Sequence, residues 1–235
     1  MTKFAFITDL HLDEPFPIQL GANARQNLEI ILNDVRDRQI DEIVLGGDLG
    51  ENSSNQWLFS KLEGFKVSLV LGNHDELSSV SRYFDHREDP SQTALYYQTE
   101  DEHFRRIYMD SSASVISEEQ IEWLKGTFTG PKPALLFIHH CIFPVASAID
   151  QKHHLSNRKV LQDILLSSKV PVTIFSGHYH MDDVQEKESV TQILTPAVSY
   201  QVTKKAIPIA THINSFGYRV VSIGAEGVST ELITF

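Results

Sequence analysis

The segment Val67-Ser68-Leu69-Val70-Leu71-Gly72-Asn73-His74-Asp75 joins a short apolar run to four polar or turn-forming residues. The run from Val67 to Leu71 is rich in branched aliphatic residues, which predicts a buried β-strand. Glycine allows a sharp backbone turn, so the polar side chains of residues 72–75 follow the strand at once. Ligands of open α/β sheets bind at the carboxyl ends of strands, and the segment therefore predicts a site at the edge of a sheet.

Four further motifs stand in the same position relative to a predicted strand. They are Asp9-Leu10-His11 after 3–8, Gly46-Gly47-Asp48 after 42–45, His139-His140 after 134–138, and Gly177-His178-Tyr179-His180 after 170–175. Strand ends of this kind gather at one side of an α/β sheet. We therefore expect all five motifs to converge.

The residue types in these motifs are those of a metal site. Imidazole and carboxylate groups suit Zn, Fe and Mn, and a thiolate cluster is excluded because Cys141 is the one cysteine. In Asp-x-His and His-x-His the two side chains point to the same side of an extended segment, about 6.6 Å apart. A lone Asp-x-His is commonly a surface loop and a lone Gly-Gly-Asp is commonly a turn, whereas Gly-Asn-His-Asp is more specific. All five together, in this order and each after an apolar strand, indicate a functional site.

The overall pattern predicts a single α/β domain over residues 1–235. Amphipathic helices are predicted at 23–39 and 157–168, and weaker ones at 55–62 and 77–84. Ser117 is the expected N-cap of another helix, with Gln120 at the capping-box position. The strands are continuously apolar, as in strands covered on both faces, and the end of the chain from Val184 is mostly β. This arrangement predicts a sheet-based sandwich covered by helices.

Composition narrows the classes of function. Lys and Arg total 20 and Asp and Glu total 31, so the net charge is −11. An acidic chain is a poor candidate for nonspecific binding to nucleic acid or to a membrane surface. The single cysteine suits a reducing compartment, and no apolar run reaches the roughly 20 residues of a membrane span. We therefore expect a cytoplasmic protein.

The ordered set of motifs resembles the calcineurin-like metallophosphoesterases. Three further segments, 109–112, 117–124 and 195–201, are similar to the class III cyclic-nucleotide phosphodiesterase branch. The resemblance runs from about Lys3 to Arg219. It implies the metallophosphoesterase fold, a four-layer α/β/β/α sandwich, which agrees with the pattern of strands and helices.

The resemblance also implies a role for each site residue. Asp9, His11 and His180 match the ligands of a first ion, Asp48 matches a bridging carboxylate, and Asn73, His139 and His178 match the ligands of a second ion. His74 matches a catalytic histidine beside the phosphate. Asn73, His74 and His140 are the expected substrate contacts. The implied cofactors are two ions of Mn, Fe or Zn.

The implied reaction is hydrolysis of a phosphodiester, cyclic nucleotides among the candidates, by a hydroxide that bridges the two ions. Two divalent ions, two aspartates and one hydroxide give a site charge of about +1. The ions would thus attract a phosphate ester into a protein that is acidic overall. Either Glu51 or Asp75 is expected to orient His74, although Asp75 is equally placed to fix the loop.

Several alternatives stay open from the sequence. The chain could be a sibling enzyme that acts on nucleotides, phospholipid head groups or phosphomonoesters. The metal motifs contact only the phosphate and do not distinguish these substrates. A noncatalytic scaffold on the same fold is a more distant reading, since all the ligand positions are present. The expected partner is a small phosphate ester, without a membrane or nucleic acid, and the resemblance allows a homodimer.

Overall fold

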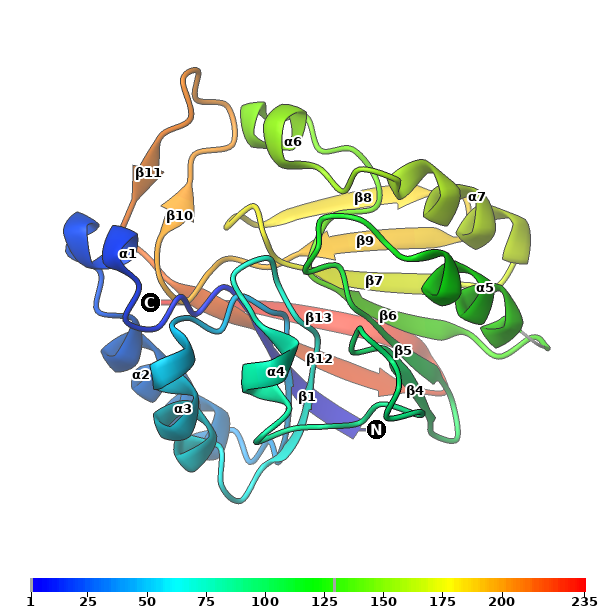
Figure 1. Cartoon of the computed structure of the whole chain (residues 1–235), viewed down its shortest axis with the longest axis horizontal. Helices are drawn as coiled ribbons and strands as arrows, with labels where there is room; N and C mark the ends of the chain where they lie inside the picture. The colour runs from blue at the N-terminus through cyan, green and yellow to red at the C-terminus, as the bar shows by residue number, and fades with distance from the viewer. Residues whose placement is uncertain (1, 129) are drawn as a thin grey trace.

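The computed structural model describes residues 2–128 and 130–235 and shows two β-sheets packed face to face, with helices on the outer side of each (Figure 1). The first sheet has the order β13-β12-β1-β2-β3 and the second has the order β4-β5-β6-β7-β9-β8. The predicted four-layer α/β/β/α sandwich is confirmed.

The first sheet contains β1 (Thr2–Ile7), β2 (Glu42–Leu45), β3 (Lys66–Leu69), β12 (Gly217–Gly224) and β13 (Gly227–Thr234). The second contains β4 (Tyr97–Glu100), β5 (Arg105–Met109), β6 (Ala134–Ile138), β7 (Val172–Ser176), β8 (Asp183–Lys187) and β9 (Val190–Leu194). A separate antiparallel pair is formed by β10 (Gln201–Val202) and β11 (Thr211–His212). The helices are α1 (Pro15–Leu20), α2 (Ala24–Asp37), α3 (Asn55–Lys61), α4 (Leu77–Val80), α5 (Glu118–Thr127), α6 (Ala148–His153) and α7 (Arg158–Ser168), with a 3₁₀ turn at Asn52–Ser54.

Each sheet contains a set of parallel strands. β1, β2 and β3 run in one direction, and so do β5, β6, β7 and β9. In the six-stranded sheet antiparallel strands lie on both sides of the parallel set, whereas in the five-stranded sheet β12 pairs antiparallel with β1 on one side and β3 forms the other edge. The carboxyl ends of the parallel strands therefore point out of each sheet on a common side, where polar side chains can meet.

Aromatic rings fill the space between the sheets. Phe4 and Phe6 of β1 meet Phe137 of β6 and Phe175 of β7 with ring centroids 5.6–6.0 Å apart. Side chains alternate along a strand, so Leu136 and its even-numbered neighbours in β6 face the helices instead. Both faces of the central strands are thus buried, as their continuous apolar sequence predicts.

The helices lie on the outer faces as their sequence patterns require. The amphipathic helix predicted at 23–39 corresponds to α2, which buries one apolar stripe of Leu28, Ile31, Leu32 and Val35. The Asn23 side chain accepts a hydrogen bond from Gln26 N at its N-terminus. Helices α5 and α7 cover the six-stranded sheet through buried leucines at positions 124, 161 and 165.

Some predicted elements differ from the structure. The helix predicted at 77–84 is confined to α4. Ser117 caps α5 as predicted. Only half of the capping box forms, because the Gln120 side chain is buried and exchanges hydrogen bonds with the backbone of Asp110 instead of with Ser117 N. Within the described part of the chain, no helix has the length and apolar character that a membrane crossing needs.

Candidate metal centre

Backbone hydrogen bonds join the loops that follow the parallel strands. Asp9 N donates to Gly47 O at 3.0 Å and His11 N donates to Asp48 O at 2.9 Å, so the turns after β1 and β2 run side by side. A further contact joins the loop after β7 of the second sheet to the loop after β1. His178 N donates to both carboxylate oxygens of Asp9 at 3.0 Å. The predicted convergence of strand ends is confirmed.

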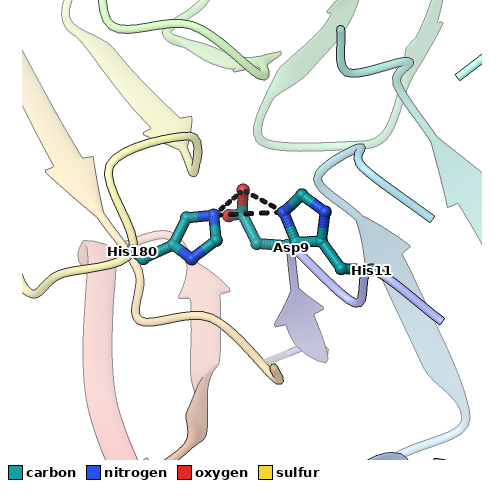
Figure 2. A group of neighbouring side chains, drawn as sticks. All are labelled: Asp9, His11 and His180. Atoms are coloured by element: carbon teal, nitrogen blue, oxygen red, sulfur yellow. Dashed lines mark hydrogen bonds and ion pairs between the residues drawn. The ribbon is translucent and has the colours of Figure 1, made fainter. Parts of the chain in front are cut away.

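Asp9, His11 and His180 form a first group of possible ligands (Figure 2). The Asp9 carboxylate lies between the two imidazole rings, with Oδ1 3.1 Å from His180 Nε2 and 4.0 Å from His11 Nε2. The two Nε2 atoms are 3.2 Å apart. All three residues are buried. Their separations are small enough for one ion to reach all three ligand atoms.

Asp48, His139 and His178 form a second group. Asp48 Oδ2 lies 3.1 Å from His139 Nε2 in this group and 3.5 Å from His11 Nε2 in the first. The Asp48 carboxylate therefore stands between the two groups, where a bridging ligand is needed. Asn73 is exposed in the turn beside this group.

Each histidine of the two groups has one ring nitrogen engaged by an oxygen acceptor. The Nδ1 atoms of His11, His139 and His180 lie 2.8–2.9 Å from Glu14 Oε2, Gly46 O and Tyr200 O respectively. His178 is the reverse case, because its Nε2 lies 2.8 Å from His153 O. A hydrogen bond at one nitrogen fixes the tautomer and directs the other nitrogen's lone pair to a metal. The donor set therefore fits metal ions.

His139 gives an independent test of this fit. Its Nε2 atom is buried and makes no hydrogen bond within the described residues, although Asp48 is close. Burial opposes the charged ring, but the carboxylates of Asp48 and Asp9 raise the pKa of His139 to about 10. Burial keeps the pKa of His178 low, at about 3. A buried ring nitrogen that faces two carboxylates and has no hydrogen-bond partner is a position that a metal ion can fill, with the imidazole neutral.

Five of these residues adopt left-handed backbone conformations that side chains other than glycine rarely take. The φ angles are 55° at Asp9, 46° at His11, 53° at Asp48, 68° at His178 and 49° at His180. Such strain gathers at functional sites, where the surrounding structure holds it in place. The loops after the strands thus direct these five side chains into the cluster, and the backbone strain at each residue lowers the stability of the fold.

Gly72, in the motif that follows β3, lies so close to Asp48 that a side chain would not fit. A Cβ atom on Gly72 would overlap both the carboxylate and the backbone nitrogen of Asp48. The absence of a side chain here lets the turn after β3 lie against Asp48, where His74 N donates to Asp48 Oδ1 at 2.9 Å.

His74 lies at the open side of the cluster, with 44% of its side chain exposed. Its ring meets the ring of His11 edge-on at 4.7 Å. Its Nδ1 atom is 3.0 Å from Glu14 Oε2, the same oxygen that binds His11. This hydrogen bond is the main reason that the pKa of His74 is raised to about 9. Burial, the largest effect, raises the pKa of Glu14, but the hydrogen bonds and electrostatic effects of His11 and His74 outweigh it and lower the pKa to about 2.

The sequence reasoning missed Glu14. The signal that could have found it is its position three residues after His11, where a tight turn brings the two side chains together. The expected partners of His74 were Glu51 and Asp75. Glu51 is exposed and makes no side-chain hydrogen bond or ion pair with the described residues. Asp75 is the loop-fixing acceptor, since its carboxylate binds the backbone N–H groups of Asp48, Leu49 and Gly72 at 2.8 Å.

His140 is buried behind the cluster rather than beside His74. Its ring lies 4.1 Å from that of His178, and its Nδ1 is 2.9 Å from Ser111 Oγ. Burial, the largest effect, and the neighbouring histidines lower its pKa strongly. Its substrate contact stays a prediction. Cys141 is fully buried, which agrees with a packing role.

The chain has sequence relatives of known family. The model of the calcineurin-like phosphoesterases matches residues 2–182. A probable cyclic nucleotide phosphodiesterase of Fibrobacter succinogenes is 25% identical, with 98% of this chain and 93% of the relative covered. The 3',5'-cyclic adenosine monophosphate phosphodiesterase CpdA of Haemophilus influenzae is 26% identical, covering 98% and 89%.

Solved structures support the fold. A dimetal phosphatase from Danio rerio has a TM-score of 0.67 and 14% identity, covering 99% of this chain and 98% of that one. The purple acid phosphatase PPD1 of yellow lupin has a TM-score of 0.70 and 14% identity, covering 98% and 51%. With the matched family model and the buried ligand groups, these findings show that the chain belongs to the calcineurin-like phosphoesterase family and is a metal-dependent phosphoester hydrolase.

Proposed function

We propose that the chain hydrolyses phosphodiesters, with cyclic nucleotides as the leading substrates, at a centre of two metal ions. The observation that carries the proposal is the position of Asp48, whose Oδ2 is 3.5 Å from His11 Nε2 and 3.1 Å from His139 Nε2. One carboxylate oxygen is thus shared by two ligand groups. The relatives named as cyclic nucleotide phosphodiesterases, which align along nearly the whole chain, support this choice of substrate.

The residues that would hold the ions divide into two sets. The first comprises Asp9, His11 and His180, the second comprises Asn73, His139 and His178, and Asp48 belongs to both. Imidazole and carboxylate ligands fit Mn, Fe or Zn. When bound, two such ions supply a nucleophile at neutral pH and neutralise charge on the phosphoryl oxygens.

His74 is the catalytic residue that we assign from the chain itself. It lies at the exposed side of the cluster, and its hydrogen bond to Glu14 favours the protonated ring at neutral pH. A protonated imidazole there can donate a hydrogen bond to a phosphoryl oxygen or a proton to the leaving oxygen. Glu14 is a positioning residue, because it restrains His74 and His11 with one oxygen.

A sibling phosphodiesterase activity is the second candidate. The glycerophosphodiester phosphodiesterase GpdQ of Enterobacter lignolyticus is 26% identical over 188 residues, covering 73% of this chain and 66% of the relative. The substrate in the name of this relative is a phosphodiester, as proposed for this chain, but it is not a cyclic nucleotide. Parallel assays of cyclic AMP and of glycerophosphoethanolamine separate the two candidates, and the preferred substrate is the one with the higher kcat/KM.

The test of the proposal compares bis(4-nitrophenyl) phosphate with 4-nitrophenyl phosphate, using protein reloaded with Mn²⁺. We expect diester turnover to exceed monoester turnover, and Asn73→Ala to abolish it. Metal content, measured on the same samples, shows whether two ions bind per chain. Preference for the monoester would refute the phosphodiesterase assignment, and a stoichiometry of one would refute the dinuclear centre.

A further inference from the structure

An aromatic wall leads from the candidate metal centre to the surface. We define it as Phe16 of α1 and Tyr200, which follows β9. The Tyr200 ring lies 4.3 Å from the His180 ring and 5.7 Å from the His11 ring, and the Phe16 ring lies 5.3 Å from Tyr200 at an interplanar angle of 80°. The wall therefore begins at two of the proposed ligands and runs outward.

The position of the wall is fixed relative to the cluster. Tyr200 O accepts the hydrogen bond of His180 Nδ1 at 2.8 Å, and Phe16 follows Glu14 by two residues. At the other end of α1, a Cβ atom on Gly21 would lie 3.5 Å from Ile213 Cδ1 beside β11, and Figure 1 shows α1 next to the β10–β11 pair. The Tyr200 end of the wall is therefore held against His11 and His180.

The outer end of the wall is uncovered. Phe16 is 49% exposed although it is a large apolar side chain, and Tyr200 is partly exposed. An edge-to-face contact uses one ring edge and one ring face, which leaves aromatic surface free for a ligand. A ligand with an anionic group and a flat ring would suit this arrangement. The anionic group would lie at the polar site and the ring against the exposed aromatic surface.

We propose that the aromatic wall binds the base of a nucleoside phosphodiester by stacking, while the phosphate lies at the metal centre. This inference rests on the proposed phosphodiesterase function and adds the recognition of a flat ring to it. Bases stack on aromatic side chains whatever their hydrogen-bonding pattern, so the wall would accept purines and pyrimidines alike. The specificity would therefore be for nucleotides as a class.

The experiment uses two esters that release the same 4-nitrophenolate. One is thymidine 5′-(4-nitrophenyl phosphate), which carries a base, and the other is methyl 4-nitrophenyl phosphate, which does not. We expect the wild type to have the lower KM for the thymidine ester. Phe16→Ala should raise that KM by about fivefold or more, the usual effect of losing one stacked base, and leave the KM of the methyl ester within about twofold.

Control variants separate stacking from other effects. Phe16→Trp keeps an aromatic face and should retain the low KM, whereas Phe16→Leu keeps apolar volume alone and should behave like Phe16→Ala. Ile18→Ala removes a neighbour on α1 that is 58% exposed and should change neither KM. Light scattering after gel filtration monitors the oligomeric state of each variant.

The outcomes distinguish the two levels of the proposal. Equal KM changes for both esters in Phe16→Ala, or a change in oligomeric state shared by Phe16→Ala and Ile18→Ala, would overturn the stacking role alone. Failure of the metal-loaded wild type to cleave either ester would overturn the phosphodiesterase function, and the stacking role with it.

Discussion

Replacement of Glu14 by glutamine tests the least expected contact of the site. Glutamine keeps the size and one acceptor oxygen but removes the negative charge. The wild-type oxygen lies 2.9 Å from His11 Nδ1 and 3.0 Å from His74 Nδ1. The variant therefore weakens two hydrogen bonds without emptying the site, so both histidines are less firmly held.

The size of the effect follows from hydrogen-bond energies. A bond to a charged group contributes about 1.5–3 kcal/mol, and roughly half of this depends on the charge. Each histidine thus loses about 0.75–1.5 kcal/mol. Because 1.36 kcal/mol is a factor of ten in rate, weaker restraint of His74 lowers kcat about 4- to 13-fold. The weaker contact to His11 lowers metal affinity by a similar factor.

The assay measures kcat for bis(4-nitrophenyl) phosphate at saturating Mn²⁺ and repeats it across a Mn²⁺ titration. Glu51→Gln is the matched control, since Glu51 is exposed and lies outside the cluster. If Glu14 acts through His74, then Glu14→Gln should lower kcat little further in a His74→Asn background. If Glu14→Gln lowered kcat in the His74→Asn background as much as in the wild type, Glu14 would not act through His74. Equal effects of Glu14→Gln and Glu51→Gln on kcat would refute a specific role for Glu14.

Three further perturbations have defined outcomes. Gly72→Ala pushes a methyl group into Asp48, so it should lower metal content and activity, whereas Gly126→Ala, which has open space around it, should leave both unchanged. Phe137→Ala opens the core between the sheets and should lower the free energy of unfolding by about 3–5 kcal/mol in urea titrations, with near-normal activity per folded molecule. For Asp101, burial is the largest effect and opposes ionisation, but hydrogen bonds from Phe104 N and His103 N outweigh it and lower the pKa. A lowered pKa gives stability that is present above about pH 4 and lost as the pH falls, so Asp101→Asn should flatten the acid decline of Tm.

The sequence predicted the elements whose signals are local. β2 and β6 have the predicted bounds, and α2 corresponds to the helix predicted at 23–39, because apolar periodicity and capping act within a few residues. The members of both ligand groups were predicted as well, since polar residues at the ends of parallel strands must meet. Short elements such as α1 and α6 were missed, because six residues carry too little periodicity to detect.

The pairwise contacts inside the site were beyond prediction. Glu51 was one expected partner of His74, yet Glu14 takes that place because the turn after His11 brings its carboxylate to both histidines. Gln120 shows the same limitation, since its amide binds Asp110 instead of the start of its own helix. Spacing along the chain fixes which residues share an edge, but the tertiary fold decides which side chains meet.

The left-handed backbone at the ligand positions places catalysis and stability in opposition. Five such residues at about 1 kcal/mol each amount to about 5 kcal/mol, as much as the whole net stability of some domains. Glycine at any of these positions would relieve the strain and remove a proposed ligand in the same step. Selection for thermal stability alone, in the laboratory or in nature, would therefore favour variants that keep the sandwich and lose the enzyme.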